Sequence, residues 1–315
     1  MVLGTEARGV ESSAHQSVLY PVISSAVASI LTGTALVATR YVVPQADGLT
    51  IAMLRYILAA ACLLPLVPAF HRFDVAWRDV LPIMALGVLY FGVFPWCISA
   101  AMQYTTASEG AIVLASTPAM TLLIGGLRGS ERWSIYKGFG VLFAVLGAAV
   151  AYSGTNAGID PSSGSALMVL ATACGAVYAV YSKPYLAKYS PLSVTSIAMA
   201  AGAVALTAAW FFVHRTTGAP KLDASGWLSI LYIGIAGGAL SFFLYAWALG
   251  RASPTAIMIL LPLNPIAALV AGSLWLGEPL GLGLFAGLAL VIIGIVLVVR
   301  PSDNARRPWP WTRRT

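Results

Sequence analysis

Residues 252–278 read ASPTAIMILLPLNPIAALVAGSLWLGE, and residues 107–131 read ASEGAIVLASTPAMTLLIGGLRGSE. Both stretches begin with Ala-Ser, contain a proline near the middle and end with a glutamate. The central proline, Pro118 in one copy and Pro265 in the other, precedes that glutamate by the same interval. An odd number of predicted membrane crossings separates the start of one stretch from the start of the other, so the copies would run in opposite directions. Inverted repeats of this kind are typical of carriers that open alternately to the two sides of a membrane.

The composition indicates a membrane protein. Of 315 residues, 59% are hydrophobic and 9% are charged, whereas a soluble domain carries about 25% charged residues. A spanning helix needs about 20 mostly apolar residues. The sequence therefore predicts an all-α membrane protein with ten transmembrane helices in two inverted five-helix repeats. The ten segments are 19–40, 49–70, 80–103, 108–127, 135–153, 164–183, 193–213, 226–249, 254–276 and 281–299.

A polar, glycine-rich run after the fifth segment divides the chain. Such runs mark loops between periodic segments. We expect a cytoplasmic tail at 1–18, a first repeat at 19–153, a linker at 154–163, a second repeat at 164–299 and a basic cytoplasmic tail at 300–315. Because each repeat would bury a face against the other, we do not expect them to fold as independent domains.

The net charge of +7 raises the question of nucleic-acid binding, but the distribution of the basic residues argues against it. With the N-terminus in the cytoplasm, fourteen Lys and Arg fall in inside regions and three fall in outside loops. An excess of cytoplasmic basic residues determines orientation. We therefore predict a multi-pass protein of the cell (inner or plasma) membrane with both termini in the cytoplasm and no nucleic-acid partner.

Prolines interrupt the fourth and ninth predicted segments, at Pro118 in one and at Pro262 and Pro265 in the other. Each proline removes a backbone hydrogen bond and disturbs the carbonyl four residues earlier. At bilayer depth, such backbone is tolerated only where protein or a water-filled cavity satisfies it. Two interpretations stay open: both broken helices line a central substrate cavity, or neighbouring side chains repair ordinary kinks. The polar side chains beside the breaks, which the first interpretation places in the cavity, are Ser116, Thr117 and Asn264.

Arg55 lies about 9 Å into the second segment, at 1.5 Å per residue. Its side chain could extend to the outer interface, or it could face the bundle and bind a carboxylate or backbone carbonyls. Aromatic side chains with polar tips occur inside other segments, and apolar pockets with a few polar groups suit amphipathic molecules. The aromatic candidates for the cavity are Tyr90, Trp96, Tyr178, Tyr181 and Tyr245.

Helix-end signals and a glycine pair predict local features of the fold. Ser253-Pro254 resembles a helix start, and Glu109 is placed to cap one in the first repeat. Gly283 and Gly287 form a small-residue face, which favours packing within the chain and leaves a dimer seam as the alternative. Oligomeric state therefore stays open between a monomer and a homodimer.

No carboxylate or histidine falls in the middle of a predicted helix. Because proton-driven carriers usually place a titratable group along their path, we expect a facilitated carrier rather than one driven by an intramembrane proton site. The chain also lacks an HExxH motif and a buried acidic pair, so we predict no enzyme activity, no metal and no cofactor. A nucleotide-sugar or organophosphate antiporter is the alternative, but its substrates need several cationic partners. A non-transporting polytopic receptor or an intramembrane enzyme is a remote alternative, and the inverted repeat with its matched helix breaks argues against the receptor.

The span from about residue 20 to 299 resembles the EamA-type branch of the drug/metabolite transporter superfamily. The residues that carry the resemblance are ALGRASPTA at 248–256, LPLNPIAA at 261–268 and LGEPL at 276–280, with looser matches QYTTAS at 103–108 and GSER at 129–132. The resemblance implies ten helices in two inverted halves around a central cavity. It also implies export of small metabolites, often amino acids or drug-like amphipathic compounds, as the small-molecule substrate.

Overall fold

The computed structural model describes residues 3–66, 75–129, 134–153, 161–214, 222–249, 260 and 262–299. Every regular element in these ranges is a helix. Six helices are long and apolar enough to cross a membrane, and four shorter apolar helices accompany them among the described residues. The protein is therefore an all-helical, multi-pass membrane protein. The six long helices are Tyr20–Val42, Trp77–Ala101, Ala107–Leu127, Ser163–Lys188, Leu192–Val213 and Ala224–Tyr245.

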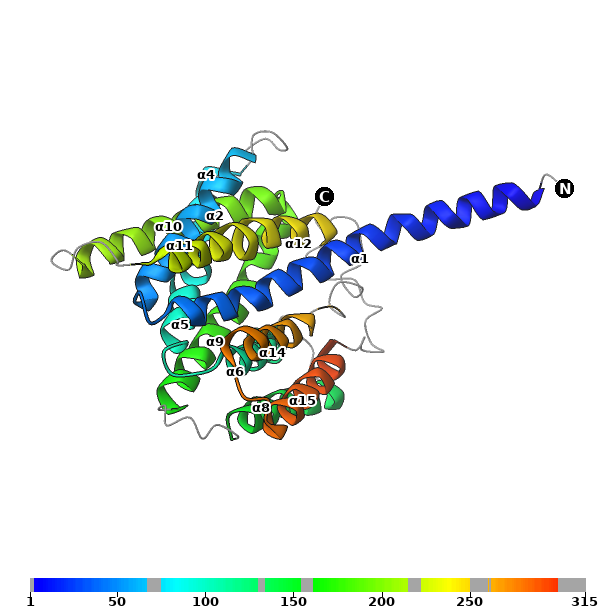
Figure 1. Cartoon of the computed structure of the whole chain (residues 1–315). Helices are drawn as coiled ribbons and strands as arrows, with labels where there is room; N and C mark the ends of the chain where they lie inside the picture. Colours follow the sequence, from blue (N-terminus) through cyan, green and yellow to red (C-terminus); the bar gives the residue numbers. More distant parts are fainter. Residues whose placement is uncertain are drawn as a thin grey trace.

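Some of these helices are composite. The helix at 77–101 changes from α-helix to π-helix and back, and the helix at 107–127 is divided at Ser116. The first helix begins at Leu3 rather than near residue 19, so it extends through the predicted tail and its N-terminal part projects beyond the other helices (Figure 1). The elements up to residue 153 are α1 (Leu3–Val42), α2 (Gly48–Leu63), η1 (Leu64–Leu66), α4 (Trp77–Gly87), η2 (Val88–Val93), α5 (Phe94–Ala101), α6 (Ala107–Ala115), α7 (Thr117–Leu127) and α8 (Ile135–Ser153).

The later part of the chain repeats one of these irregularities. Its helix at 224–249 also contains a central π-helical stretch between two α-helical pieces. The elements are α9 (Pro161–Lys188), α10 (Pro191–Val213), α11 (Ala224–Leu231), η3 (Tyr232–Leu240), α12 (Ser241–Leu249), α14 (Leu263–Leu276) and α15 (Leu282–Val299).

Helices from the two parts of the chain pack against each other. Helix α1 lies against η3, α12 and α14, and α10 lies against α2, α4 and η2. Helix α8 runs beside α15 (Figure 1). A Cβ on Gly147 would come within 2.6 Å of the Gly287 carbonyl, and one on Gly140 within 2.8 Å of the Gly294 carbonyl. Small residues allow such close backbone approach, so Gly287 serves packing within the chain.

Candidate functional site

Two π-helical stretches, η2 and η3, lie in the middle of long helices. Short π-helical segments inside α-helices are rare and are frequently found at functional sites. Neither stretch contains a proline. The stretch η2 contains one glycine, Gly92, and η3 contains three, Gly234, Gly237 and Gly238. Sequence reasoning identified the proline breaks and missed these two segments, although the glycines were a possible signal.

Arg55 lies inside the bundle. It belongs to α2 and is 7% exposed, and its Nη2 donates a hydrogen bond of 3.3 Å to the Gly237 carbonyl of η3. Its guanidinium lies 5.5 Å from the centre of the Tyr56 ring. The Nε atom is buried and has no hydrogen-bond partner among the described residues. Of the two orientations that the sequence allowed, the structure has the one facing the bundle.

The acidic side chains that the structure describes, which do not include those of Glu6 and Glu11 at the start of α1, are engaged elsewhere. None of them has an ion pair with Arg55 in the described part of the chain. Asp79 contacts Lys188 at 2.6 Å, and the other four bind helix N-termini: Asp47 at α2, Glu109 and Glu278 at α6, and Asp223 at α11. Arg55 is therefore a buried cation without a carboxylate partner among the described residues.

Aromatic rings surround the same region. Tyr90 of η2 stacks on Tyr178 of α9, with ring centres 4.3 Å apart and planes 12° from parallel. Phe94 stacks on Tyr90 at 5.0 Å. We call the set formed by Tyr56, Tyr90, Phe91, Phe94, Tyr178 and Phe242 the aromatic cluster. Offset and edge-to-face ring contacts stabilise such packing by about 0.5–1.5 kcal/mol per pair.

The hydroxyl groups of Tyr56 and Tyr90 lie near the cation. Tyr90 is within electrostatic reach of Arg55 and of the Tyr56, Tyr178 and Tyr245 hydroxyls. Tyr245 belongs to α12 and is half-buried. Four of the sequence candidates, Arg55, Tyr90, Tyr178 and Tyr245, are thus brought together from α2, η2, α9 and α12. These elements come from both halves of the chain.

Two aromatic candidates lie elsewhere. Trp96 of α5 is 40% exposed and makes no ring contact with the aromatic cluster in the described part of the chain. Tyr181 of α9 is 41% exposed, and the Arg128 guanidinium lies 4.2 Å from its ring centre.

Polar side chains beside Pro118 satisfy the backbone at the break. Helix α6 ends at Ala115 with Ser116 as its C-cap, and Pro118 stands in the first turn of α7. The Thr117 hydroxyl donates to the Leu114 carbonyl, which Pro118 cannot bond because it has no N–H. The Ser116 hydroxyl donates to the Val113 carbonyl at 2.6 Å. The side-chain hydroxyls of Ser116 and Thr117 therefore bond to backbone carbonyls one turn away.

The second break is described in part. Helix α14 begins just after Pro262, and Pro265 is buried in its first turn. A Cβ on Gly33 of α1 would lie 2.2 Å from the Asn264 carbonyl, so α14 packs tightly on α1 here. The helix start expected at Ser253-Pro254 lies outside the described residues.

A glutamate connects the two halves at the N-terminus of α6. Gly277 ends α14 in the left-handed conformation, at φ 64°, which glycine adopts without strain. The next residue, Glu278, accepts hydrogen bonds from the Ala107 amide at 2.7 Å, the Ser108 hydroxyl at 2.6 Å and the Ser108 amide at 3.2 Å. Glu109 forms a capping box with Thr106, as its position suggested. Glu278, the glutamate that ends the second copy of the sequence repeat, thus has a structural role.

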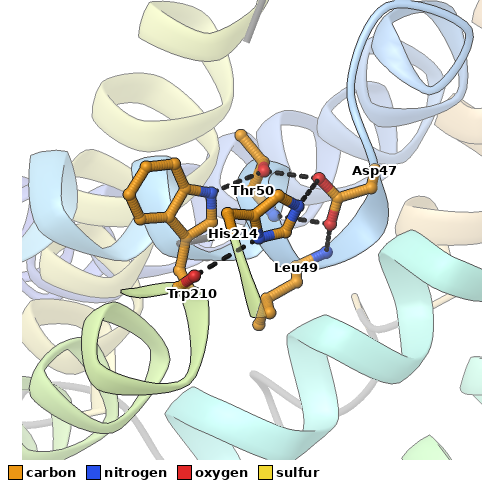
Figure 2. A network of polar contacts seen from close by, with 5 residues as sticks. All are labelled: Asp47, Leu49, Thr50, Trp210 and His214. Atoms are coloured by element: carbon orange, nitrogen blue, oxygen red, sulfur yellow. Dashed lines mark hydrogen bonds and ion pairs between the residues drawn. The ribbon is translucent and has the colours of Figure 1, made fainter. Parts of the chain in front are cut away.

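A second polar network connects α10 with the start of α2 (Figure 2). Asp47 accepts from the Leu49 and Thr50 amides, and His214 Nε2 lies 3.2 Å from Asp47 Oδ1. The indole of Trp210 donates to the Thr50 hydroxyl at 2.8 Å and stacks on the His214 ring. These groups bond to one another and fix the end of the α2–α10 contact.

Known proteins resemble nearly the whole chain. It is 28% identical over 268 residues to an uncharacterized transporter of Archaeoglobus fulgidus, which covers 85% of this chain and 94% of the relative. It is 33% identical over 235 residues to a probable terminal-alkyne amino-acid exporter of Streptantibioticus cattleyicolor, covering 73% of this chain and 76% of that protein. A solved crystal structure shares the fold at a TM-score of 0.62 and 17% identity, covering 89% of this chain and 96% of the other.

The family model for EamA-like transporters matches twice, over residues 19–153 and 162–300. These two matches cover most of the chain, as the resemblance of its motifs predicted. The chain belongs to the EamA-like transporter family.

Proposed function

We propose that this protein exports small organic metabolites, amino acids or drug-like amphipathic compounds, by alternating access. The proposal rests on the family membership, on relatives named as transporters, and on the buried aromatic and cationic site. The full architecture that we propose has ten spans in two inverted five-helix halves, with repeat boundaries at 19–153 and 164–299. The bias of basic residues supports a cell membrane with both termini in the cytoplasm.

One observation carries the assignment of the site: Arg55 is buried beside aromatic side chains that come from both halves of the chain. A charged residue inside a membrane bundle usually marks a substrate or ion pathway. A carrier of alternating access places its substrate between the two repeats near the middle of the bilayer. We therefore place the substrate between α2, η2, α9, η3 and α12.

The transport mode that we propose is facilitated. The described acidic side chains bind helix ends or Lys188, so none of them stands beside Arg55 as a proton acceptor. Because proton relays in carriers use titratable side chains inside the membrane, we propose that this carrier follows the gradient of its own substrate. Flux of a neutral solute that follows an imposed pH gradient would contradict this part of the proposal.

Flux into proteoliposomes tests the proposed site. We expect the purified protein to carry members of a panel of amino acids, amines and sugar nucleotides. Because a stacked aromatic contact contributes about 0.5–1.5 kcal/mol, Tyr178→Ala should lower flux at limiting substrate by roughly 2- to 10-fold.

Trp96→Ala is the matched control. It also removes a large aromatic ring from a long apolar helix, but one that is exposed and outside the aromatic cluster. We expect near-normal flux. Equal losses in Trp96→Ala and Tyr178→Ala would argue that the cluster is not the binding site, and absence of flux for every solute would argue against the proposed function itself.

A further inference from the structure

The guanidinium of Arg55 has unused hydrogen-bonding capacity inside the bundle. It is 7% exposed, its Nη2 bonds a neutral carbonyl at 3.3 Å, and its Nε has no partner among the described residues. Burial of a cation without an anion is costly. The residues that the structure describes supply no carboxylate to it, so a bound anion would complete the site.

The geometry of the guanidinium defines the anion that fits. The Nε–H and one Nη–H of an arginine share an edge of a planar group, and this edge matches the two oxygens of a carboxylate. At Arg55 the Nη2 bond goes to the Gly237 carbonyl. That carbonyl also accepts from the Ser241 hydroxyl at 2.7 Å, so it keeps a partner if a carboxylate takes the arginine.

The surroundings define the rest of the ligand. Tyr56 lies beside the guanidinium, and the stacked Tyr90 and Tyr178 are close by. Such rings offer apolar faces with few polar groups. Among the described residues, Arg55 is the cation whose charge reaches Tyr56 and Tyr90, so a ligand with one negative group is matched and one with two or more is not.

We propose that Arg55 binds the carboxylate of the transported solute, and that the substrates are monocarboxylates with an apolar or aromatic side chain, zwitterionic amino acids included. This inference rests on the proposed function. It adds a rule of recognition: the carboxylate supplies much of the binding, and its replacement by an uncharged amide weakens binding. It also predicts that substrate binding weakens the hydrogen bond from Arg55 of α2 to the Gly237 carbonyl of η3.

Competition for flux in proteoliposomes tests the rule without any variant. Uptake of radiolabelled L-phenylalanine is measured with unlabelled L-leucine, L-phenylalanine, phenylalaninamide or phenethylamine in excess. We expect the two amino acids to compete, and the amide and the amine to compete ~10- to 100-fold less well, since a hydrogen-bonded charge contributes about 1.5–3 kcal/mol. Equal competition by the amide would overturn the inference and leave the proposed function standing.

Substitutions then assign the discrimination to Arg55. Arg55→Gln should raise the KM for phenylalanine by a similar factor and should remove the difference between acid and amide, whereas Arg55→Lys should retain part of it because the charge remains. Arg40→Gln is the matched control. Arg40, in the last turn of α1, also donates to a backbone carbonyl, that of Met102.

The outcomes separate the possible failures. Retained discrimination between acid and amide in a folded Arg55→Gln protein would overturn the role of Arg55. If the Arg55→Gln protein did not fold, Arg55→Lys would be the test instead. An unchanged KM for phenylalanine in that variant would overturn the role of Arg55. Uptake of none of the amino acids by the wild-type protein, together with uptake of amines, would overturn the carboxylate rule, and uptake of no solute at all would overturn the proposed function.

Discussion

Arg55 and Glu278 are both buried charged residues that join the two halves of the chain, and they differ in how fully their hydrogen-bonding capacity is used. Glu278 is 8% exposed and accepts three hydrogen bonds from Ala107 and Ser108. Arg55 is 7% exposed and makes one long bond to a neutral carbonyl. Burial alone therefore does not distinguish a structural charge from a binding charge.

The difference lies in how many hydrogen-bonding atoms of each buried charge have a partner. A carboxylate at a helix N-terminus gains from the free amides and from the helix dipole, and at Glu278 those amides are bonded. Gly272 leaves the space for it, because a Cβ there would lie 2.5 Å from Glu278 Oε2. A guanidinium with an unbonded Nε keeps capacity for a ligand, which is what a carrier needs at its site.

The largest loss of stability should follow Glu278→Ala. The substitution leaves the buried amides of Ala107 and Ser108 without their acceptor, and each such group costs about 1–3 kcal/mol. We expect a loss of about 3 kcal/mol in the free energy of unfolding, measured by denaturant titration of the purified protein in detergent.

Arg55→Gln is the comparison for that measurement. Removing a buried cation that lacks an anion relieves its desolvation cost, so we expect the free energy of unfolding to change by no more than about 1 kcal/mol. If Arg55→Gln destabilised the protein as much as Glu278→Ala, Arg55 would be a structural charge and the contrast drawn above would fail.

Thr117→Val should have a smaller effect, of about 1 kcal/mol. The Thr117 hydroxyl bonds the Leu114 carbonyl, which Pro118 leaves without an amide donor. Thr121→Val is the matched control, since the Thr121 hydroxyl bonds the Thr117 carbonyl at 2.8 Å, four residues back within α7, where the helix supplies an amide of its own. Thermal unfolding of both variants tests this prediction. An equal loss of stability in the two would mean that the Thr117 hydroxyl does not specifically satisfy the backbone at the proline break.

The fold class was predictable because it depends on composition and length. A chain with 59% hydrophobic residues and apolar runs of membrane length has few alternatives. The interruption near Pro118 was also predictable, since proline lacks the amide that a helix needs. The π-helical stretches were not, because neither contains a proline whose missing amide would have marked it. Close packing accompanies the first stretch, since a Cβ on Gly87, the residue before η2, would lie 2.2 Å from the Ala198 carbonyl of α10.

The site was predictable in part. Distance along a helix gives the depth of Arg55 but not the direction of its side chain, so the sequence could not decide between the interface and the bundle. Tyr178 and Tyr181 are three residues apart on α9, yet the first stacks on Tyr90 and the second lies under Arg128. The sequence repeat showed which residues of the two copies are equivalent, but not which residues touch. In the structure, the hydrogen bond between Glu278 and Ala107 joins the end of one copy to the start of the other.

The smallest effect should come from an exposed acidic cap, Asp223→Asn. Hydrogen bonds from the Ser225 hydroxyl and the Gly226 amide, each 2.6 Å long, hold the pKa of Asp223 below its ordinary value of 3.8. A lowered pKa in the folded protein means that the charge adds stability above the ordinary pKa, and that this stability is lost as pH falls through the folded value. Because asparagine caps helices as well as aspartate does, only the charge is removed. We expect a slightly lower melting temperature for Asp223→Asn at about pH 7, and convergence with the wild-type protein as the pH falls below the lowered pKa of Asp223 in the folded protein. A gap that widened on acidification would mean that the charge at this exposed cap does not stabilise the fold, and that the analogy with Glu278 does not extend to exposed caps.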